Sequence, residues 1–219
     1  MLAIKEIYEK RFTTFERIQK QELWAILCTD FLQSFIKKTD TVIDLGAGRC
    51  EFINNIKCKN KIAVDVNREI KQIAHTDVKI VIASVKNLKN LFKANSADII
   101  FMSNLLEHLD TKEDVFRLLH EAYTILKKGG RLLIMQPDIK RVGNSYWDFF
   151  DHKVPLTAES LTEALRANNY SINKMYNPFL PYTTKKKFLP LFPILLKIYL
   201  KIRPIHYFFG KQFFVCAEK

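Results

Sequence analysis

The feature that most constrains this chain is a short apolar run that ends in two glycines. Residues 41–45 read Thr-Val-Ile-Asp-Leu, and Gly46 and Gly48 follow with only Ala47 between them. A short β-rich run closed by glycines is typical of a buried parallel strand that ends in a tight turn. Glycine also lets the backbone come close to a ligand, because it has no Cβ. The pattern predicts a strand, a ligand-binding turn, and then a helix whose free N–H groups point into the same space.

A second apolar run, residues 61–67, contains Asp65 about 20 residues beyond the first glycine. In a doubly wound sheet, a glycine turn after one strand and an acid at the end of the next hold a nucleoside, with the carboxylate on the ribose hydroxyls. Dinucleotide folds place a third glycine where this chain has Glu51, whose charge would repel a pyrophosphate. Asp44 is equally unsuited to phosphate but suits an ammonium group. The two strands therefore predict a site for an adenosine with a cationic amino-acid tail.

The Asp-x-Gly-x-Gly pattern of residues 44–48 resembles the first motif of the class I S-adenosylmethionine-dependent methyltransferases. Within that class, the chain resembles the type 11 methyltransferases. This resemblance implies S-adenosylmethionine as the cofactor. In the family, an acid after the third strand commonly accepts the adenine amino group; Ser84 takes that place here and is a weaker acceptor. The cofactor-binding residues expected from this resemblance are Asp44, Gly46, Ala47, Gly48, Asp65, Val66, Ser84, Val85 and Asn104.

The remaining periodicity fits five β/α repeats, and the resemblance to the family implies two closing strands after them. We expect an α/β fold, a Rossmann-like doubly wound seven-stranded sheet that is mostly parallel, with an antiparallel last strand and helices on both faces. The further strands are expected at 77–83, 96–102, 131–135, 171–176 and 212–217, and helices at 14–36, from Thr111 to Gly129, and from Thr157 to Asn169. The whole chain, 1–219, is interpreted as one methyltransferase domain: cap helix 1–40, cofactor-binding core 41–177, basic apolar insertion or lid 178–211, and last strand 212–219.

Two loops supply candidate catalytic residues. The segment after the fourth strand, 103–109, resembles the Leu-Glu-His-Leu segment of methyltransferases that act on small molecules, and it makes His108 a candidate beside Asn104. The loop after the fifth strand contains Asp151 and His152, the composition of a base and its orienting carboxylate. A structural role remains an equal alternative for both histidines. No metal site is predicted, because no carboxylate and histidine cluster has ligand spacing.

The net charge of +12 implies an anionic partner. Residues 183–217 contain seven Lys or Arg and no Asp or Glu, and they enclose the apolar run 188–200. That run is too short and too broken by prolines to span a bilayer, which needs about 20 residues. It can lie in a membrane interface or close the substrate cleft as a lid. Tyr8, Arg11 and Phe12 could also reach a substrate.

The four cysteines have no paired spacing, so we expect free thiols. The N-terminal residues do not resemble a secretory signal, so we expect a cytoplasmic location or a peripheral position on the inner membrane face. Residues 146–153 and 179–185 resemble a bacterial subgroup linked with surface-polysaccharide and glycolipid assembly. The predicted function is therefore O-methylation of a sugar or glycolipid hydroxyl. The alternatives are methylation of a soluble metabolite, a nucleic-acid substrate, and a non-catalytic cofactor-binding protein. The acceptor, the identity of the base and the oligomeric state stay open.

Overall fold

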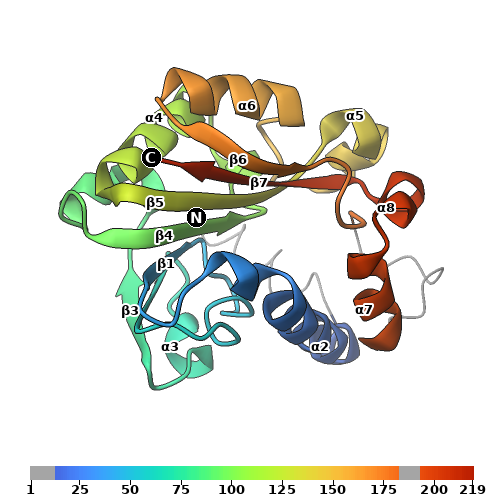
Figure 1. Cartoon of the computed structure of the whole chain (residues 1–219), viewed down its shortest axis with the longest axis horizontal. Helices are drawn as coiled ribbons and strands as arrows, with labels where there is room; N and C mark the ends of the chain where they lie inside the picture. The colour runs from blue at the N-terminus through green and yellow to red at the C-terminus, as the bar shows by residue number, and fades with distance from the viewer. Residues whose placement is uncertain (1–12, 183–192) are drawn as a thin grey trace.

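The computed structural model describes residues 13–182 and 193–219, and in these ranges seven strands form one sheet (Figure 1). The strand order is β3-β2-β1-β4-β5-β7-β6, and only β7 runs antiparallel to its neighbours. This is the doubly wound, mostly parallel sheet that the sequence predicts. The strands are β1 (Thr41–Leu45), β2 (Asn60–Asp65), β3 (Val78–Ile82), β4 (Ala97–Ser103), β5 (Leu126–Pro137), β6 (Ser171–Tyr176) and β7 (Gln212–Glu218).

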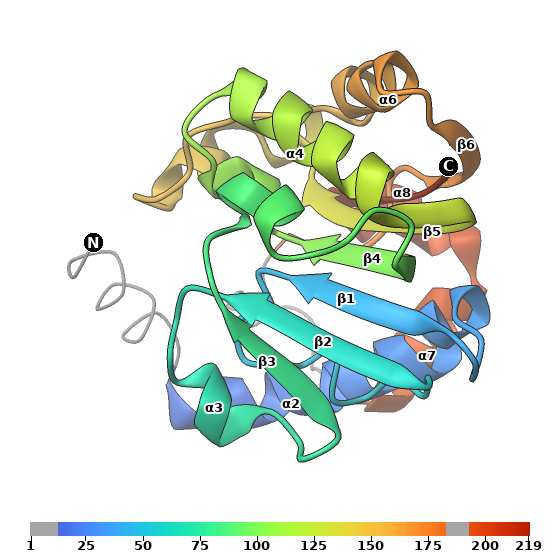
Figure 2. The same ribbon diagram turned by 90° about the vertical axis from the view of Figure 1, so that its left-hand side faces the viewer.

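Helices cover both faces of the sheet (Figure 2). One face carries α4 and α6, and the other carries α2, α3 and α7. The α-helices are α2 (Thr14–Asp30), α3 (Ile70–Ile73), α4 (Lys112–Ile125), α5 (Ile139–Val142), α6 (Ala158–Ala167), α7 (Pro193–Lys201) and α8 (Arg203–Phe209). Short 3₁₀ turns are η1 (Leu32–Phe35), η2 (Val85–Asn90), η3 (Leu106–His108) and η4 (Gly143–Asp148).

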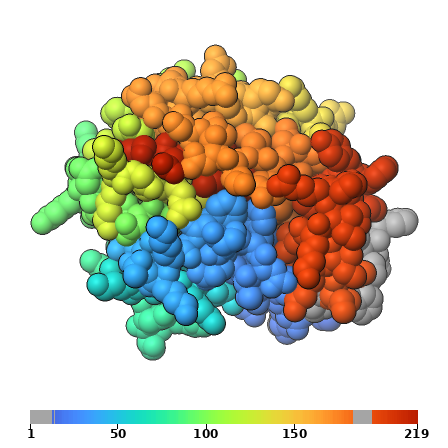
Figure 3. Space-filling view, in the orientation of Figure 1, coloured from blue at the N-terminus to red at the C-terminus, as the bar shows by residue number. Residues whose placement is uncertain are grey.

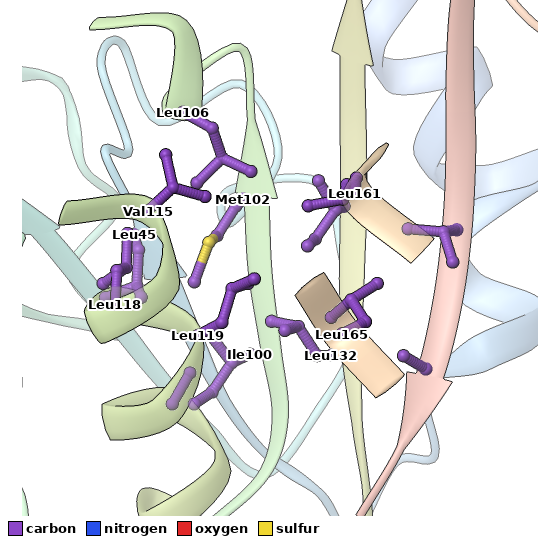
Figure 4. Packing of buried hydrophobic residues seen from close by; sticks show 14 of the residues in the cluster. Leu45, Ile100, Met102, Leu106, Val115, Leu118, Leu119, Leu132, Leu161 and Leu165 are labelled. Atoms are coloured by element: carbon purple, nitrogen blue, oxygen red, sulfur yellow. The ribbon is translucent and has the colours of Figure 1, made fainter. Parts of the chain in front are cut away.

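Each face of the sheet has its own hydrophobic core. On the first face, the leucines of α4 and α6 pack onto the strands, as Figure 4 shows for Leu119, Leu161 and Leu165 around Ile100 and Leu132. On the second face, α2 packs against the sheet with a cluster of aromatic rings centred on Phe31. Because both faces are covered, the central strands read as continuous apolar runs in the sequence.

Some predicted helix boundaries are wrong. The first helix ends at Asp30 and not at residue 36, and η1 follows it. Thr111 is the N-cap of α4 as expected, but α4 ends at Ile125, so residues 127–130 belong to β5 rather than to a helix end. Gly130 permits this, because a Cβ there would lie only 2.9 Å from the carbonyl oxygen of Lys127 and would crowd the backbone of β4.

The helix predicted after the glycine turn is also absent from the structure, in which residues 46–55 form successive turns. Two asparagines give the reason. The amide of Asn55 donates to the carbonyl of Glu51, and the side chain of Asn54 binds the backbone of residues 73 and 75. Side chains that bind nearby or distant backbone in this way compete with helix formation.

The insertion between β6 and β7 contains α7 and α8. Residues 183–192 lie outside the described residues, as do Tyr8, Arg11 and Phe12, so the expectations for them are not addressed by the structure. No helix in the described ranges is long and apolar enough to cross a membrane.

Candidate functional site

The glycine turn lies at the carboxyl end of β1. Gly46 and Gly48 have φ values of 70° and 54°, in the left-handed region that favours glycine. The N–H of Gly46 donates to the carbonyl of Val64 at 2.9 Å, which joins the turn to β2. A Cβ on Gly46 would lie 2.8 Å from the Leu105 side chain, so the loop after β4 closes directly over the turn.

Asp65, the last residue of β2, faces this turn. Its Oδ2 accepts a hydrogen bond from the N–H of Gly48 at 2.7 Å, and its Oδ1 accepts one from the N–H of Asn67 at 2.7 Å. Burial raises the pKa of the Asp65 carboxyl, and these backbone donors lower it in part. The carboxylate is thus oriented by the turn and stays partly accessible, as a ligand with hydroxyl groups requires.

Asp44, within β1, provides a test of whether the residues fit the cofactor. It is buried, and its Oδ2 has no hydrogen-bond partner among the described residues. Burial raises the pKa of Asp44 well above its usual range, and the charges of Glu51 and Asp65 add to this effect. A buried, unpartnered carboxylate oxygen is costly unless a donor or cation satisfies it. The ammonium group of an amino-acid tail is such a partner, so the residues fit the cofactor that the sequence predicts.

The other predicted cofactor residues follow the neighbouring strands. Val66 is 63% exposed, which leaves an apolar surface beside Asp65 for a flat ring. Ser84 is exposed and its Oγ accepts from the N–H of Lys86, while Val85 is buried. Asn104 has a φ of 47°, and its N–H donates to the carbonyl of Met135. The structure brings all the predicted cofactor residues to the carboxyl ends of β1 to β4.

The candidate catalytic residues form a second cluster beyond β4 and β5. The Nδ1 of His108 lies 3.3 Å from Oδ2 of Asp151 and 3.1 Å from its carbonyl oxygen. The rings of His108 and His152 contact each other edge to face, with centroids 5.1 Å apart. The Nδ1 of His152 lies 3.4 Å from the hydroxyl of Tyr182. The carboxylate of Asp151 therefore lies beside the imidazole of His108, which comes from the other loop.

Glu107 and Gln136 belong to this cluster and were missed in the sequence. Glu107 is buried, and Gln136 Nε2 donates to its Oε2 at 2.7 Å. Burial raises the pKa of Glu107, and the charge of His108 partly opposes that shift. The signal that could have found them is position, since Gln136 lies at the carboxyl end of β5 and Glu107 follows the carboxyl end of β4.

A divalent metal ion could also be held here. One ligand atom each from Glu107, His108 and His152 lies within 4.8 Å of the others. The expectation of no metal site rested on spacing along the chain, and spacing cannot detect this set because two distant loops contribute to it. Two histidines and one carboxylate are a common ligand set for transition metals.

Aromatic rings border the cluster. Phe149 stacks on the ring of His152, with centroids 4.9 Å apart, and the buried Tyr146 donates its hydroxyl to the carbonyl of Val154. Trp147 and Phe150 are 57% and 83% exposed. Aromatic rings of this exposure are typical of a surface that binds a ligand. The whole arrangement offers a ligand site over β1 to β4 beside an acid–base cluster.

Comparisons with known proteins agree on the fold. Residues 43–134 match the family described as "Methyltransferase domain". Over 132 residues the chain is 30% identical to the uncharacterized protein MJ1252 of Methanocaldococcus jannaschii, a match that covers 59% of this chain and 49% of that protein. The chain thus spans about half the length of the curated relatives it matches.

Solved structures extend the likeness to nearly the whole chain. A SAM-dependent methyltransferase from Archaeoglobus fulgidus superimposes with a TM-score of 0.69 at 18% identity and 99% coverage of both chains. A putative methyltransferase from Haloferax volcanii, solved in complex with the Trm112 methyltransferase activator, gives a TM-score of 0.65 at 15% identity and covers 92% of this chain and 91% of that one. At these identities the likeness shows the fold.

Proposed function

We propose that this chain, whose residues 43–134 match a methyltransferase domain, is an S-adenosylmethionine-dependent methyltransferase that methylates a hydroxyl group of a sugar or glycolipid. Its cofactor is S-adenosylmethionine. The observation that carries the proposal is the pairing of His108 with Asp151 one turn beyond the loop that closes over Gly46. An oriented imidazole at that place can take the proton of an acceptor hydroxyl.

In this proposal the two acids of the first site hold the two polar ends of the cofactor. Asp65 binds the ribose hydroxyls and Asp44 receives the ammonium group of the methionine part. Val66 and Val85 contact the adenine ring, and Ser84 binds its edge. The backbone at Gly46, Ala47, Gly48 and Asn104 encloses the tail.

The acceptor side depends on the tautomer of His108. With its Nδ1–H donating to Asp151, the ring keeps a lone pair on Nε2 for a proton. The bound cofactor would supply an activated methyl group and leave as a neutral thioether, and Nε2 of His108 would take the proton of the acceptor hydroxyl. Most of the rate comes from holding the two reactants in line. Asp151 acts as a positioning residue, and His152 supports the ring of His108.

A sugar acceptor is supported by the rim of the cluster. Trp147 and Phe150 present exposed rings in the loop that contains His152, and the apolar face of a sugar ring can pack on such surfaces. The polar cluster at the centre would then fix one hydroxyl. The resemblance of residues 146–153 and 179–185 to glycan-associated enzymes supports the same class of acceptor.

The test combines methyl transfer with cofactor binding. His108→Ala should lower turnover about 10²- to 10⁴-fold, measured by mass spectrometry of glycolipid extracts incubated with labelled cofactor. Calorimetry should show unchanged cofactor affinity. Asp151→Asn should lower turnover less and shift the pH profile, because it changes how the imidazole is held.

His120→Ala on α4 is the matched control, since this histidine is exposed and lies outside the cluster. If His152→Ala abolishes turnover while His108→Ala does not, the base is His152. If neither change affects transfer, neither histidine of this cluster is the base. Methylation found only on soluble metabolites would exclude the glycolipid acceptor.

A further inference from the structure

The outer face of α7 and α8 is a surface of exposed apolar side chains, called here the α7–α8 surface. On α7 the positions recur at helical spacing, so one side of the helix is apolar toward solvent. On α8 three consecutive aromatic residues are exposed, and Phe208 is 83% exposed. The exposed apolar residues of this surface are Ile194, Leu195, Ile198, Ile202, Tyr207, Phe208 and Phe209. Figure 3 shows that the two helices form a continuous part of the molecular surface beside α2.

The charge on this surface has one sign. Lys197, Lys201, Arg203 and Lys211 are all exposed. The sequence from Pro193 to Ala217 contains no Asp or Glu to neutralise them. Basic groups interleaved with bulky aliphatic and aromatic groups match a partner that has an anionic outer layer and an apolar layer beneath it. A nucleic-acid site would instead combine its basic groups with a polar face.

The opposite side of the two helices is fixed to the body of the protein. The Tyr199 hydroxyl donates to the carbonyl of Phe179, and a ring nitrogen of His206 lies 2.9 Å from the carbonyl oxygen of Tyr199. The rings of Tyr199 and His206 stack with centroids 4.5 Å apart, and α7 packs along α2. The exposed face is therefore held in one orientation by buried contacts, and it projects away from the core.

The α7–α8 surface lies at the same edge of the sheet as the candidate catalytic cluster. The residue Gln212, just after α8, pairs with Pro137 at the carboxyl end of β5. Asp138, the next residue, donates its N–H to the carbonyl of Lys211. The segment that leads into the insertion reaches the cluster itself, where Tyr182 lies beside His152.

We propose that the α7–α8 surface docks on the anionic surface of a lipid bilayer. The apolar side chains enter the interface, and the basic side chains contact the lipid headgroups. The orientation presents the candidate catalytic cluster to a lipid-linked acceptor, so this part of the inference rests on the proposed function. Binding to the bilayer itself does not depend on methyl transfer.

The experiment is co-sedimentation of the full chain with vesicles of phosphatidylglycerol and phosphatidylcholine, and with vesicles of phosphatidylcholine alone, across a salt series. We expect binding to the anionic vesicles that weakens with salt, with a salt-resistant part from apolar insertion. Lys197→Gln with Lys201→Gln should lower the partition coefficient roughly 25-fold at low salt, about fivefold for each basic residue. Ile198→Ser with Phe208→Ser should remove the salt-resistant part.

Matched controls are Lys128→Gln and Phe116→Ser, which change an exposed lysine and an exposed phenylalanine away from this surface. Circular dichroism checks that each variant folds. Protein that stays in the supernatant with anionic vesicles at low salt overturns the proposal. So does equal binding by the α7–α8 variants and wild type, or a dimer in light scattering that these variants dissociate. If the protein binds vesicles but calorimetry shows no cofactor binding, the proposed function is contradicted and the proposed docking surface is not.

Discussion

Asp44 connects the burial of one side chain to the pH dependence of cofactor binding. Because burial raises the pKa of Asp44, the carboxyl keeps its proton to a higher pH than an exposed aspartate would. The cofactor ammonium interacts with the ionised form only. We therefore expect cofactor affinity to fall as pH drops through this raised pKa and to level off above it. Calorimetry at a series of pH values measures this.

The sign of the effect on stability is opposite without the cofactor. A carboxyl whose pKa is raised by folding stabilises the chain least when it is ionised, so the contribution of Asp44 declines as pH rises from its unfolded pKa through its folded one. Asp44→Asn should bind the cofactor weakly and with a flatter pH profile, and a residual slope belongs to Asp65, whose pKa is also raised by burial. Wild-type affinity that is constant through the acid range would contradict the assignment.

At the scale of single residues, the sequence predicts where a side chain lies in the fold better than which side chain it contacts. Asp44 and Asp65 could be placed because each stands at a fixed point of a strand and a turn. Asp151 could be placed in a loop near the ligand, but its contact with His108 depends on two loops meeting in space. Glu107 was missed for the same reason, since its partner Gln136 comes from another strand.

At the scale of elements, one of the contacts that anchor α7 is a buried hydroxyl. Tyr199→Phe keeps the ring and its stacking on His206 but leaves the carbonyl of Phe179 without its donor. We expect the free energy of unfolding to fall by about 1–2 kcal/mol, measured by urea denaturation. Tyr207→Phe, which changes an exposed tyrosine on α8, should leave it unchanged. An equal effect of the two substitutions would mean that this anchor does not hold the helices.

Strands and helices were predictable where one hydrophobic pattern dominates the segment, and they were not predictable where other interactions compete with that pattern. The central strands have uninterrupted apolar runs, so their places agree with the sequence within a few residues. The stretch after Gly48 contains aromatic and β-branched residues at helical spacing, yet Asn54 and Asn55 direct their side chains to backbone groups and the helix does not form. The helix expected from Thr111 to Gly129 ends at Ile125 instead, and Gly130 allows close pairing of β4 and β5.

At the scale of the whole molecule, the cofactor should stabilise the fold, because its proposed site joins the ends of four strands. A ligand at 100 times its dissociation constant adds about 2.7 kcal/mol to the free energy of unfolding. We therefore expect S-adenosylmethionine to raise the melting temperature by several degrees. Asp65→Ala should lose most of this shift at the same concentration, since a hydrogen bond to a charged group is worth roughly 1–3 kcal/mol. Differential scanning fluorimetry measures both.

Asp77→Ala is the control for this measurement. Asp77 is an exposed acid that pairs with Lys61, and it lies just before β3, at the amino end of that strand and away from the proposed cofactor site. Its variant should keep the full shift. A shift that survives Asp65→Ala unchanged would remove that residue from the cofactor site.

The doubly wound, seven-stranded sheet was predictable as a whole because the resemblance to a family implies it. The insertion was not, since its composition allows a lid as well as a membrane contact. Which side chains of α7 and α8 pack inward depends on Tyr199, His206 and Phe179 meeting in space, and composition does not reveal that.

The placement of β7 also sets the order in which the chain can assemble. Within residues 13–182 and 193–219, β6 occupies the edge of the sheet and pairs only with β7, which lies between it and β5. During synthesis, residues 171–176 therefore emerge before any strand exists with which they can pair. They must wait until residues 212–218 have been made, with the whole insertion looping between them. A contact so distant along the chain forms slowly. The candidate catalytic cluster, which needs Tyr182 beside His152, is complete only after that late step.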